Sequence, residues 1–196
     1  MGLYPVFLKL KDSPCLVVGG GKVADRKVVG LLAAEALVTL IAPTVTPALS
    51  ALIEKGAVTH SKRAYRSGDV QGYDLVIAAT DSHAINRKIF TEALEARVLI
   101  NSVDDPENCR FFTPAVLQRG DLQIAISTSG QVPYFAKRLR QFLEPRIPKE
   151  IEQDVRELGS LRQSFRTGSA EHEQEAQLSH VLNPKVDEIL RKMDQA

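Results

Sequence analysis

Two adjacent carboxylates, Asp104 and Asp105, follow a short apolar run that ends in Asn101. A carboxylate held at the end of a strand can act as a general acid or base, because it exchanges a proton at a fixed position. Asp105 precedes Pro106, however, and an Asp before a proline is also typical of a turn. The residues alone leave both interpretations open.

A second candidate site is the stretch VVGGGKVADRK (17–27), in which Gly19, Gly21 and Ala24 have the spacing of a dinucleotide-binding turn. The first glycine makes the tight turn, the second lets the backbone approach a pyrophosphate, and the third small residue lets helix and strand pack closely. A helix that begins here presents free N–H groups and the positive end of its dipole to phosphates. We therefore predict a dinucleotide site; the alternative is a tight turn that binds nothing.

The acidic residue that usually holds the ribose of NAD is missing. It is expected at the end of the second strand, about 20 residues after the glycines, but residues 41–44 read IAPT. There is no arginine for a 2′-phosphate there either, so the residues leave NAD and NADP open. Backbone groups and Thr44 are the remaining candidates for ribose contacts.

A third candidate site is a loop of three hydroxyl residues and a glycine: Ser127, Thr128, Ser129 and Gly130. Lying between a predicted strand and a predicted helix, it could form an anion-binding nest. Basic residues follow in that helix: Lys137, Arg138 and Arg140. The alternative is an ordinary capped helix with a solvated basic face.

Apolar runs and helical spacing predict the elements that hold these residues. Strands are expected over residues 4–10, 14–20, 36–43, 57–65, 74–81 and 97–104, with 57–65 near an edge, and helices over 22–34, 46–56 and 83–96. In the third helix the apolar face is predicted to be Ile85, Ile89, Ala93 and Leu94. The alternation predicts an α/β fold with a Rossmann-like, doubly wound parallel sheet.

After Pro114 the pattern changes to a small α+β segment and a helical tail. A strand is expected over 121–128 and a helix from Pro133, whose apolar stripe is Phe135, Leu139, Phe142 and Leu143. Residues 144–150 read as a linker, and 151–196 as polar helix with breaks at Gly159, 166–169 and 183–184. We predict three parts: residues 1–113, 114–148 and 149–196.

Composition favours a packed, soluble chain. It has 196 residues, 44% of them hydrophobic, and a net charge of +1, so no basic excess suggests nucleic acid. Two isolated cysteines, Cys15 and Cys109, and four scattered histidines show no metal-ligand spacing. With no signal-peptide pattern and no run of roughly 18 apolar residues, we expect a cytoplasmic protein without membrane or metal sites.

Taken together, the motifs VVGGGKVADRK, LVIAATD, NSVDDP, FFTPA and IAISTSGQVPYFAKRLRQFLE resemble the N-terminal module of siroheme synthase, the precorrin-2 dehydrogenase/sirohydrochlorin ferrochelatase family. The match keeps their order from about residue 4 to about residue 148, and the helical tail fits more loosely. The resemblance implies an NAD-binding domain, a central dimerisation and tetrapyrrole-site segment, a helical tail and a homodimer. It further implies oxidation of precorrin-2 to sirohydrochlorin with hydride transfer to NAD+, and in some members Fe2+ insertion.

The resemblance also implies roles for single residues. Asp104 matches the catalytic aspartate, as the proton acceptor and as a transient contact of Fe2+, while Asp105 keeps the turn interpretation. The candidate cofactor residues are Gly19, Gly20, Gly21, Lys22, Val23, Pro43, Thr44, Thr80 and Asn101. The candidate substrate residues are Ser127, Thr128, Ser129 and Gly130, with Thr128 where the family has a serine. Glu35 replaces a glycine of the family before the second strand.

Two other classes of protein are alternatives to this family. A short-chain dehydrogenase needs a Tyr-x-x-x-Lys pair, and none of the four tyrosines has a lysine four positions later. A non-catalytic, NAD-binding redox sensor would keep the glycine turn without needing Asp104 or the hydroxyl loop. The sequence shows no basic recognition helix that would make such a sensor bind DNA.

Overall fold

The computed structural model describes residues 2–103, 105–165 and 171–194. Asp104, the proposed proton acceptor, lies outside the described residues, as does the whole of the predicted break at 166–169. The chain divides into two compact units, Gly2–Phe112 and Thr113–Ala196, and each is described by itself.

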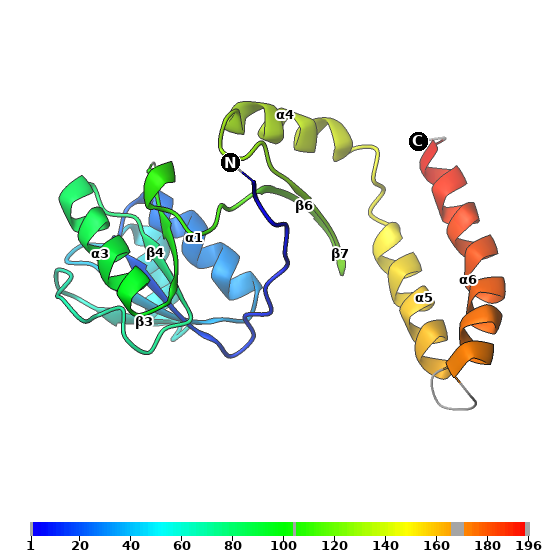
Figure 1. Ribbon diagram of the computed structural model, residues 1–196, viewed down its shortest axis with the longest axis horizontal. Coiled ribbons are helices and arrows are strands. Elements are labelled where there is room, and N and C mark those ends of the chain that lie inside the picture. The colour runs from blue at the N-terminus through cyan, green and yellow to red at the C-terminus, as the bar shows by residue number, and fades with distance from the viewer. Residues whose placement is uncertain (1, 104, 166–170, 195–196) are drawn as a thin grey trace. The chain divides into compact units, whose positions relative to one another are not determined.

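The first unit is a five-stranded parallel sheet with helices on both faces (Figure 1). Its strands are β1 (Pro14–Val18), β2 (Leu37–Ile41), β3 (Val58–Ser61), β4 (Leu75–Ala78) and β5 (Leu99–Ser102). Its helices are α1 (Lys22–Ala33), α2 (Pro47–Glu54) and α3 (His83–Glu95), with a short 3-10 helix η1 (Pro106–Asn108) after β5. The strand order β3-β2-β1-β4-β5 confirms the predicted Rossmann-like fold and puts β3 at an edge.

Alternate residues of the central strands fill two separate cores. Cys15 and Val17 of β1 pack with residues of α1 and α2, whereas Leu16 and Val18 pack with α3. This is the two-sided burial that continuous apolar runs indicate in a parallel sheet. Thr46 caps α2 through a hydrogen bond from the Leu49 N–H (3.2 Å), which helps to explain where that helix begins.

Three sequence expectations for this unit need correction or refinement. Residues 4–10 do not form a strand, and several apolar side chains of this segment are exposed. On α3, Ile85 and Leu94 are each 37% exposed, and the buried positions are Asn86, Ile89 and Ala93. Periodicity missed Asn86 because a buried polar residue does not register in an apolar pattern. Glu35, in the place of the family glycine, adopts φ 58°, the left-handed region that favours glycine.

The second unit begins with a two-stranded antiparallel sheet, β6 (Ala115–Arg119) and β7 (Leu122–Ile126), followed by α4 (Pro133–Leu143), α5 (Ile151–Phe165) and α6 (Glu171–Asp194). β6 was not predicted, because its five residues lie between turn-forming residues and carry only a short pattern. The core gathers around Leu117, Ile147 and Ile151. Helices α5 and α6 pack against each other.

The predicted breaks in the tail are partly wrong. Gly159 lies within α5 and Pro184 within α6, and both helices continue through these residues. Packing between the two helices outweighs the local helix-breaking tendency of either residue. Over the described part of the chain, no helix is both long enough and apolar enough to cross a bilayer.

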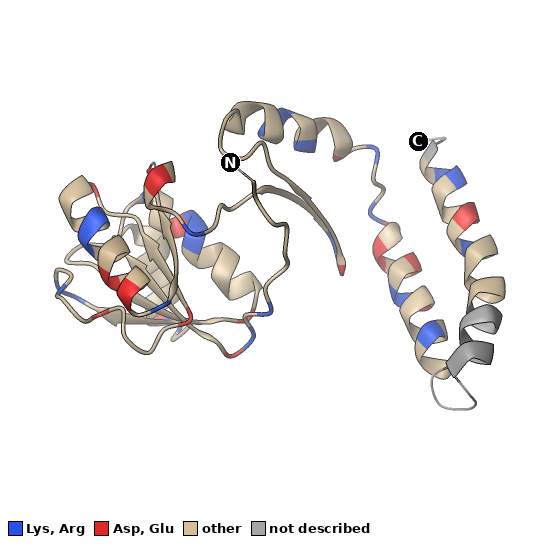
Figure 2. Cartoon of the chain, viewed as in Figure 1, with Lys and Arg blue, Asp and Glu red and all other residues tan. Residues whose placement is uncertain are grey.

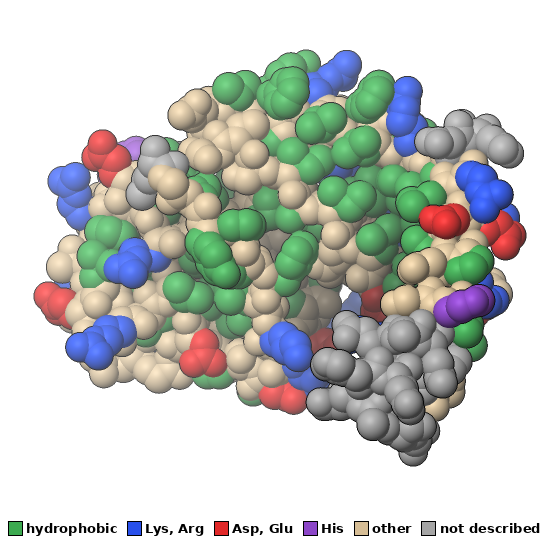
Figure 3. All heavy atoms as spheres, turned by 45° about the vertical axis from the view of Figure 1, so that its right-hand side comes forward, with side chains coloured by type: hydrophobic (Ala, Val, Ile, Leu, Met, Phe, Trp, Pro, Cys, Tyr) green, Lys and Arg blue, Asp and Glu red, His purple; other side chains and the backbone are tan. Residues whose placement is uncertain are grey.

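The surface of α4 is both basic and apolar. Lys137 and Arg138 are exposed, and the blue segments of α4 in Figure 2 mark its Lys and Arg positions. Phe135 is 56% and Phe142 55% exposed. Apolar side chains also reach the surface elsewhere in the chain, as the green areas of Figure 3 show.

Candidate functional site

The glycine turn lies at the carboxyl ends of β1 and β4, neighbouring strands whose connecting segments leave to opposite faces of the sheet. This is the point of an open α/β sheet at which ligands bind. Gly19 follows β1 with φ 117°, and a Cβ there would come within 2.2 Å of the Ala79 carbonyl oxygen. Gly19 is therefore required by the close approach of the two strand ends.

Gly20 and Gly21 face different surroundings. A Cβ on Gly20 would lie 1.9 Å from the Thr44 carbonyl oxygen, so this position is closed by the loop after β2. A Cβ on Gly21 would meet nothing within 4 Å, and its φ of −88° suits any residue. Nothing within the described chain requires a glycine at position 21, whereas a ligand that approaches the backbone would require one.

Helix α1 begins at this turn without a capping side chain. Its N-cap is Gly21, while Thr46 caps α2 and Ser82 caps α3. In α2 and α3 the cap accepts from the third N–H of the helix, at Leu49 and Ile85, whereas no side chain caps the first turn of α1. Such a helix start suits a pyrophosphate, so the turn fits a dinucleotide.

The loop after β2 forms the neighbouring wall. Pro43 and Thr44 are exposed, and the Thr46 N–H donates to the Gly20 carbonyl (3.0 Å). The Thr46 hydroxyl donates to an Asp25 carboxylate oxygen (2.6 Å), which joins this loop to the first turn of α1. The loop offers backbone groups and the Thr44 hydroxyl, as the sequence IAPT suggested, and it has no carboxylate of its own.

Thr80, after β4, is held by the buried Asn86 of α3. Its hydroxyl lies 2.7 Å from Asn86 Oδ1, and Asn86 Nδ2 donates to the Thr80 carbonyl (3.0 Å). These bonds fix Thr80 beside the glycine turn, because Gly19 lies against the backbone of Ala79 and Thr80.

Asn101, near the end of β5, is 6% exposed and its amide contacts protein on both sides. Lys27 Nζ of α1 donates to Asn101 Oδ1 (3.3 Å), and Asn101 Nδ2 donates to the Phe111 carbonyl (3.0 Å). Its proposed contact with a cofactor remains a prediction. Lys27 was missed because it is polar, although it lies three residues after the buried Ala24 on the same side of α1.

Cys109 lies beside Asn101 and is buried as a free thiol. Its Sγ donates to the Ser102 carbonyl (3.1 Å) and accepts from the Ser102 N–H (3.3 Å). Burial raises the pKa of this thiol, and the positive charge of Lys27 opposes that rise. The neutral thiol can therefore serve as the donor in these contacts.

Asp105 makes the contacts of a turn residue. Its carboxylate accepts a hydrogen bond from Asn108 Nδ2 (2.5 Å), and its carbonyl accepts one from the Asn108 N–H (3.1 Å). It also stands at the N-cap of η1. Asp104, by contrast, lies outside the described residues.

The hydroxyl loop of the second unit precedes α4. The Ser129 N–H donates to Ser127 Oγ (3.1 Å), and the Val132 N–H donates to Thr128 Oγ1 (3.1 Å). Ser129 and Gly130 both have positive φ, at 54° and 78°. Because these two hydroxyl oxygens accept from backbone, their protons are directed to other acceptors, which suits carboxylates of a ligand.

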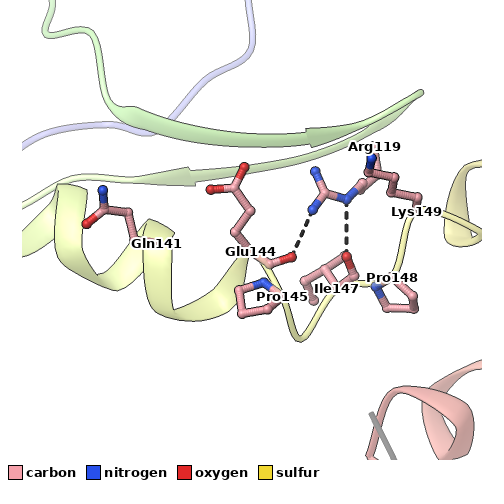
Figure 4. Close-up of a pocket in the computed structure, with 7 residues that line it drawn as sticks. All are labelled: Arg119, Gln141, Glu144, Pro145, Ile147, Pro148 and Lys149. Carbon is pink, nitrogen blue, oxygen red and sulfur yellow. Dashed lines mark hydrogen bonds between the residues drawn. The ribbon is translucent and has the colours of Figure 1, made fainter.

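A shallow pocket of the second unit, shown in Figure 4, offers less chemistry. Its arginine, Arg119, donates to the carbonyls of Ile147 (3.1 Å) and Glu144 (2.8 Å). These bonds hold the connection between α4 and α5. Among the described residues, no three His, Cys, Asp or Glu side chains gather as metal ligands would.

Two family models match the chain. One, described as "Putative NAD(P)-binding", covers residues 6–115, and the other, "Sirohaem biosynthesis protein central", covers residues 119–145. The siroheme synthase of Thioalkalivibrio sulfidiphilus is 45% identical over 148 residues, which are 76% of this chain and 30% of that protein. Siroheme synthase 1 of Serratia proteamaculans is 41% identical over 162 residues, 83% of this chain and 34% of that protein. The chain thus spans about a third of the length of these curated relatives.

A solved structure named "SirC, precorrin-2 dehydrogenase" has a similar fold along the whole chain. Its TM-score is 0.78 at 25% identity, and the match covers 99% of this chain and 100% of that one. The NAD(P)-binding model covers more than half of the chain, and the sirohaem model covers the segment that follows. The chain therefore belongs to the family described as "Putative NAD(P)-binding", and its residues 119–145 match the central segment of sirohaem biosynthesis proteins.

Proposed function

We propose that this chain oxidises precorrin-2 to sirohydrochlorin with NAD+. The observation that carries the cofactor part is Gly21, a glycine that no contact of the described chain requires, at the uncapped start of α1. The substrate part is supported by the name of the structural neighbour, precorrin-2 dehydrogenase. The reaction removes a hydride and a proton from the tetrapyrrole, and NAD+, when bound, accepts the hydride.

Different residues of the chain are assigned to cofactor binding and to proton acceptance. The Gly19–Gly21 turn and the first N–H groups of α1 hold the pyrophosphate, and the Pro43–Thr44 loop lies against the ribose. Thr80 and Asn101, at the ends of β4 and β5, complete the cofactor side. A proton acceptor is still needed, and a positioned carboxylate is suited to that task, so we assign it to Asp104.

The second unit contributes to substrate binding in this proposal. Precorrin-2 carries several carboxylates, and the hydroxyls of Ser127 and Thr128 are free to donate once their oxygens accept from backbone. Ser129 and Gly130 shape the loop through their positive φ. Thr128 keeps the hydroxyl of the family serine and adds a methyl group.

The test is to incubate the purified protein with precorrin-2 and NAD+ and to follow the absorbance of sirohydrochlorin. Formation of sirohydrochlorin with stoichiometric NADH supports the proposal, and a parallel incubation with NADP+ decides between the cofactors. A protein that binds NAD+ but never turns over precorrin-2 would instead be the redox-sensing module. Adding Fe2+ as a second substrate reveals whether sirohaem is also formed.

A further inference from the structure

Helix α1 carries a lysine that reaches β5, a strand that is not its neighbour in the sequence. Lys27 Nζ lies 3.3 Å from Asn101 Oδ1, and the two residues are 74 positions apart. Asn101 is buried at 6% exposure, and its Nδ2 donates to the Phe111 carbonyl (3.0 Å). The amide of Asn101 therefore connects α1 to the chain segment that returns after β5.

The same place closes a loop. Asn101 and Cys109 form an antiparallel bridge, and the Arg110 N–H donates to the Ile100 carbonyl (2.8 Å). The Cys109 thiol contacts both backbone groups of Ser102. Residues 100–102 and 109–110, on either side of residues 103–108 in the sequence, thus form one hydrogen-bonded base.

Building on the proposed function, we propose that Lys27 and Asn101 are positioning residues for the dehydrogenase reaction. Lys27 fixes Asn101, and Asn101, three residues before the proposed proton acceptor in the sequence, fixes the hydrogen-bonded base at the end of β5. Helix α1 thereby contributes to the reaction twice: its first turn to cofactor binding, and Lys27 to positioning the end of β5. Lys27 lies six residues after Gly21, which is about 9 Å along α1 at 1.5 Å per residue.

Packing alone does not account for a lysine at this position. The residue is half-buried, and partial removal of an ammonium group from water is costly unless hydrogen bonds compensate. An apolar side chain would cover the same sheet face, as Ala24, Val28 and Leu31 do in the rest of this helix. The ammonium group makes a hydrogen bond to Asn101 that an apolar side chain could not make.

The first measurement compares Lys27→Met, Lys27→Arg and the control Arg26→Met, which removes an exposed charge from the same helix. We expect Lys27→Met to lower kcat by about tenfold to a hundredfold, since small misplacements of reacting groups have effects of this size. The KM for NAD+ should rise by a smaller factor than kcat falls, because the glycine turn that holds the pyrophosphate is intact and Asn101 supplies only part of the cofactor side. Lys27→Arg should restore most of kcat, and Arg26→Met should match wild type.

The second measurement does not depend on activity. It follows alkylation of Cys109 by iodoacetamide with peptide mapping, and the fully buried Cys15 reports global unfolding. Because Lys27 opposes the burial-raised pKa of Cys109, removing its charge alone would slow alkylation. Faster alkylation of Cys109 in Lys27→Met, with Cys15 unchanged, therefore reports an opened loop base.

The outcomes separate the two proposals. A wild-type protein without turnover overturns the proposed function, and the assigned positioning role falls with it, while the alkylation rates still decide whether Lys27 closes the loop. Wild-type kcat in Lys27→Met overturns the inference, and so does alkylation of Cys109 no faster than in Arg26→Met. A KM for NAD+ that rises as much as kcat falls makes Lys27 a cofactor residue, which also contradicts it. If Lys27→Met does not fold, Lys27→Gln is judged by the same criteria.

Discussion

Gly19, Gly20 and Gly21 follow one another in the sequence but face three different surroundings. At the scale of single residues, this difference separates the glycines that the fold requires from the glycine that only a bound ligand would require. Substituting Gly20 drives a Cβ toward the Thr44 carbonyl, whereas the space beside Gly21 is open. The third glycine can therefore be changed to test the cofactor site without disturbing the turn.

We predict that Gly21→Val abolishes NAD+ binding, because a branched side chain occupies the path of the pyrophosphate. The free energy of unfolding should stay within about 1 kcal/mol of wild type, while Gly20→Ala should lose about 2 kcal/mol or more. Calorimetry with NAD+ and chemical denaturation measure the two effects. Unchanged NAD+ affinity in a folded Gly21→Val protein would contradict the assigned site.

The two carboxylates after β5 are predicted to differ in function. Asp104→Asn keeps the size of the side chain but cannot accept a proton, so turnover of precorrin-2 should fall by about a hundredfold or more. Asp105→Asn should cost far less, since an asparagine oxygen can still accept from Asn108 Nδ2. NAD+ affinity should change little in either variant. An inactive Asp105→Asn beside an active Asp104→Asn would show that the roles are reversed.

Replacing Glu35 by the glycine that the family resemblance implies should stabilise the fold. Its φ of 58° is unfavourable for a residue with a Cβ. Its ion pair with Lys11 (2.9 Å) is exposed on both sides and contributes little. We predict that Glu35→Gly raises the free energy of unfolding by up to about 1 kcal/mol. Glu35→Ala, which keeps the strain and loses the ion pair, should not, and equal denaturation curves for all three proteins would refute the prediction.

At the scale of elements, a loop takes the place of a helix between β3 and β4. Arg63 holds both carboxylate oxygens of Asp69, at 2.6 and 2.8 Å, and the Arg66 N–H also donates to Asp69 (2.7 Å). The loop places Val70 in the core that α3 shares with the sheet. This charged contact therefore organises a loop that packs on the same sheet face as α3.

The loop predicts a pH dependence of stability. The Arg63 guanidinium, through its hydrogen bonds, holds the pKa of Asp69 below its usual value. A lowered carboxyl pKa adds stability above the unfolded pKa of about 4, and this stability is lost as the pH falls through the folded value. Asp69→Asn should lower the free energy of unfolding by about 1–3 kcal/mol at pH 7. The deficit should shrink below about pH 4; a deficit that is constant with pH would rule out this origin.

At the scale of the whole molecule, we predict a homodimer formed through the second unit. Helix α4 exposes Phe135 at 56% and Phe142 at 55%, and such a stripe calls for a partner surface. Sedimentation at micromolar concentration should show a dimer in the wild type and weaker association in Phe135→Ser. The matched control is Val29→Ser on α1, which removes a side chain that is 58% exposed in the first unit. A monomeric wild type would disprove the dimer.

The sequence by itself determined the five strands of the sheet and the glycine turn that precedes α1. Strands buried on both faces, such as β1 and β4, appear as unbroken apolar runs, and the helices between them follow the 3.6-residue period. These signals are local, so they can be recognised without knowing which strands are neighbours. The hydroxyl loop before α4 was recognisable for the same reason.

The tertiary structure alone decided how distant residues meet. The strand order brings Thr44 against Gly20 and Ala79 against Gly19, which explains two glycines, while no contact of the described chain explains the third. It also brings Lys27 to Asn101 across 74 positions. In the second unit, packing carries α6 through Pro184 against the local preference of that residue. The spacing of apolar residues along the sequence cannot predict these contacts. They depend on which strands and helices become neighbours and on how these then pack.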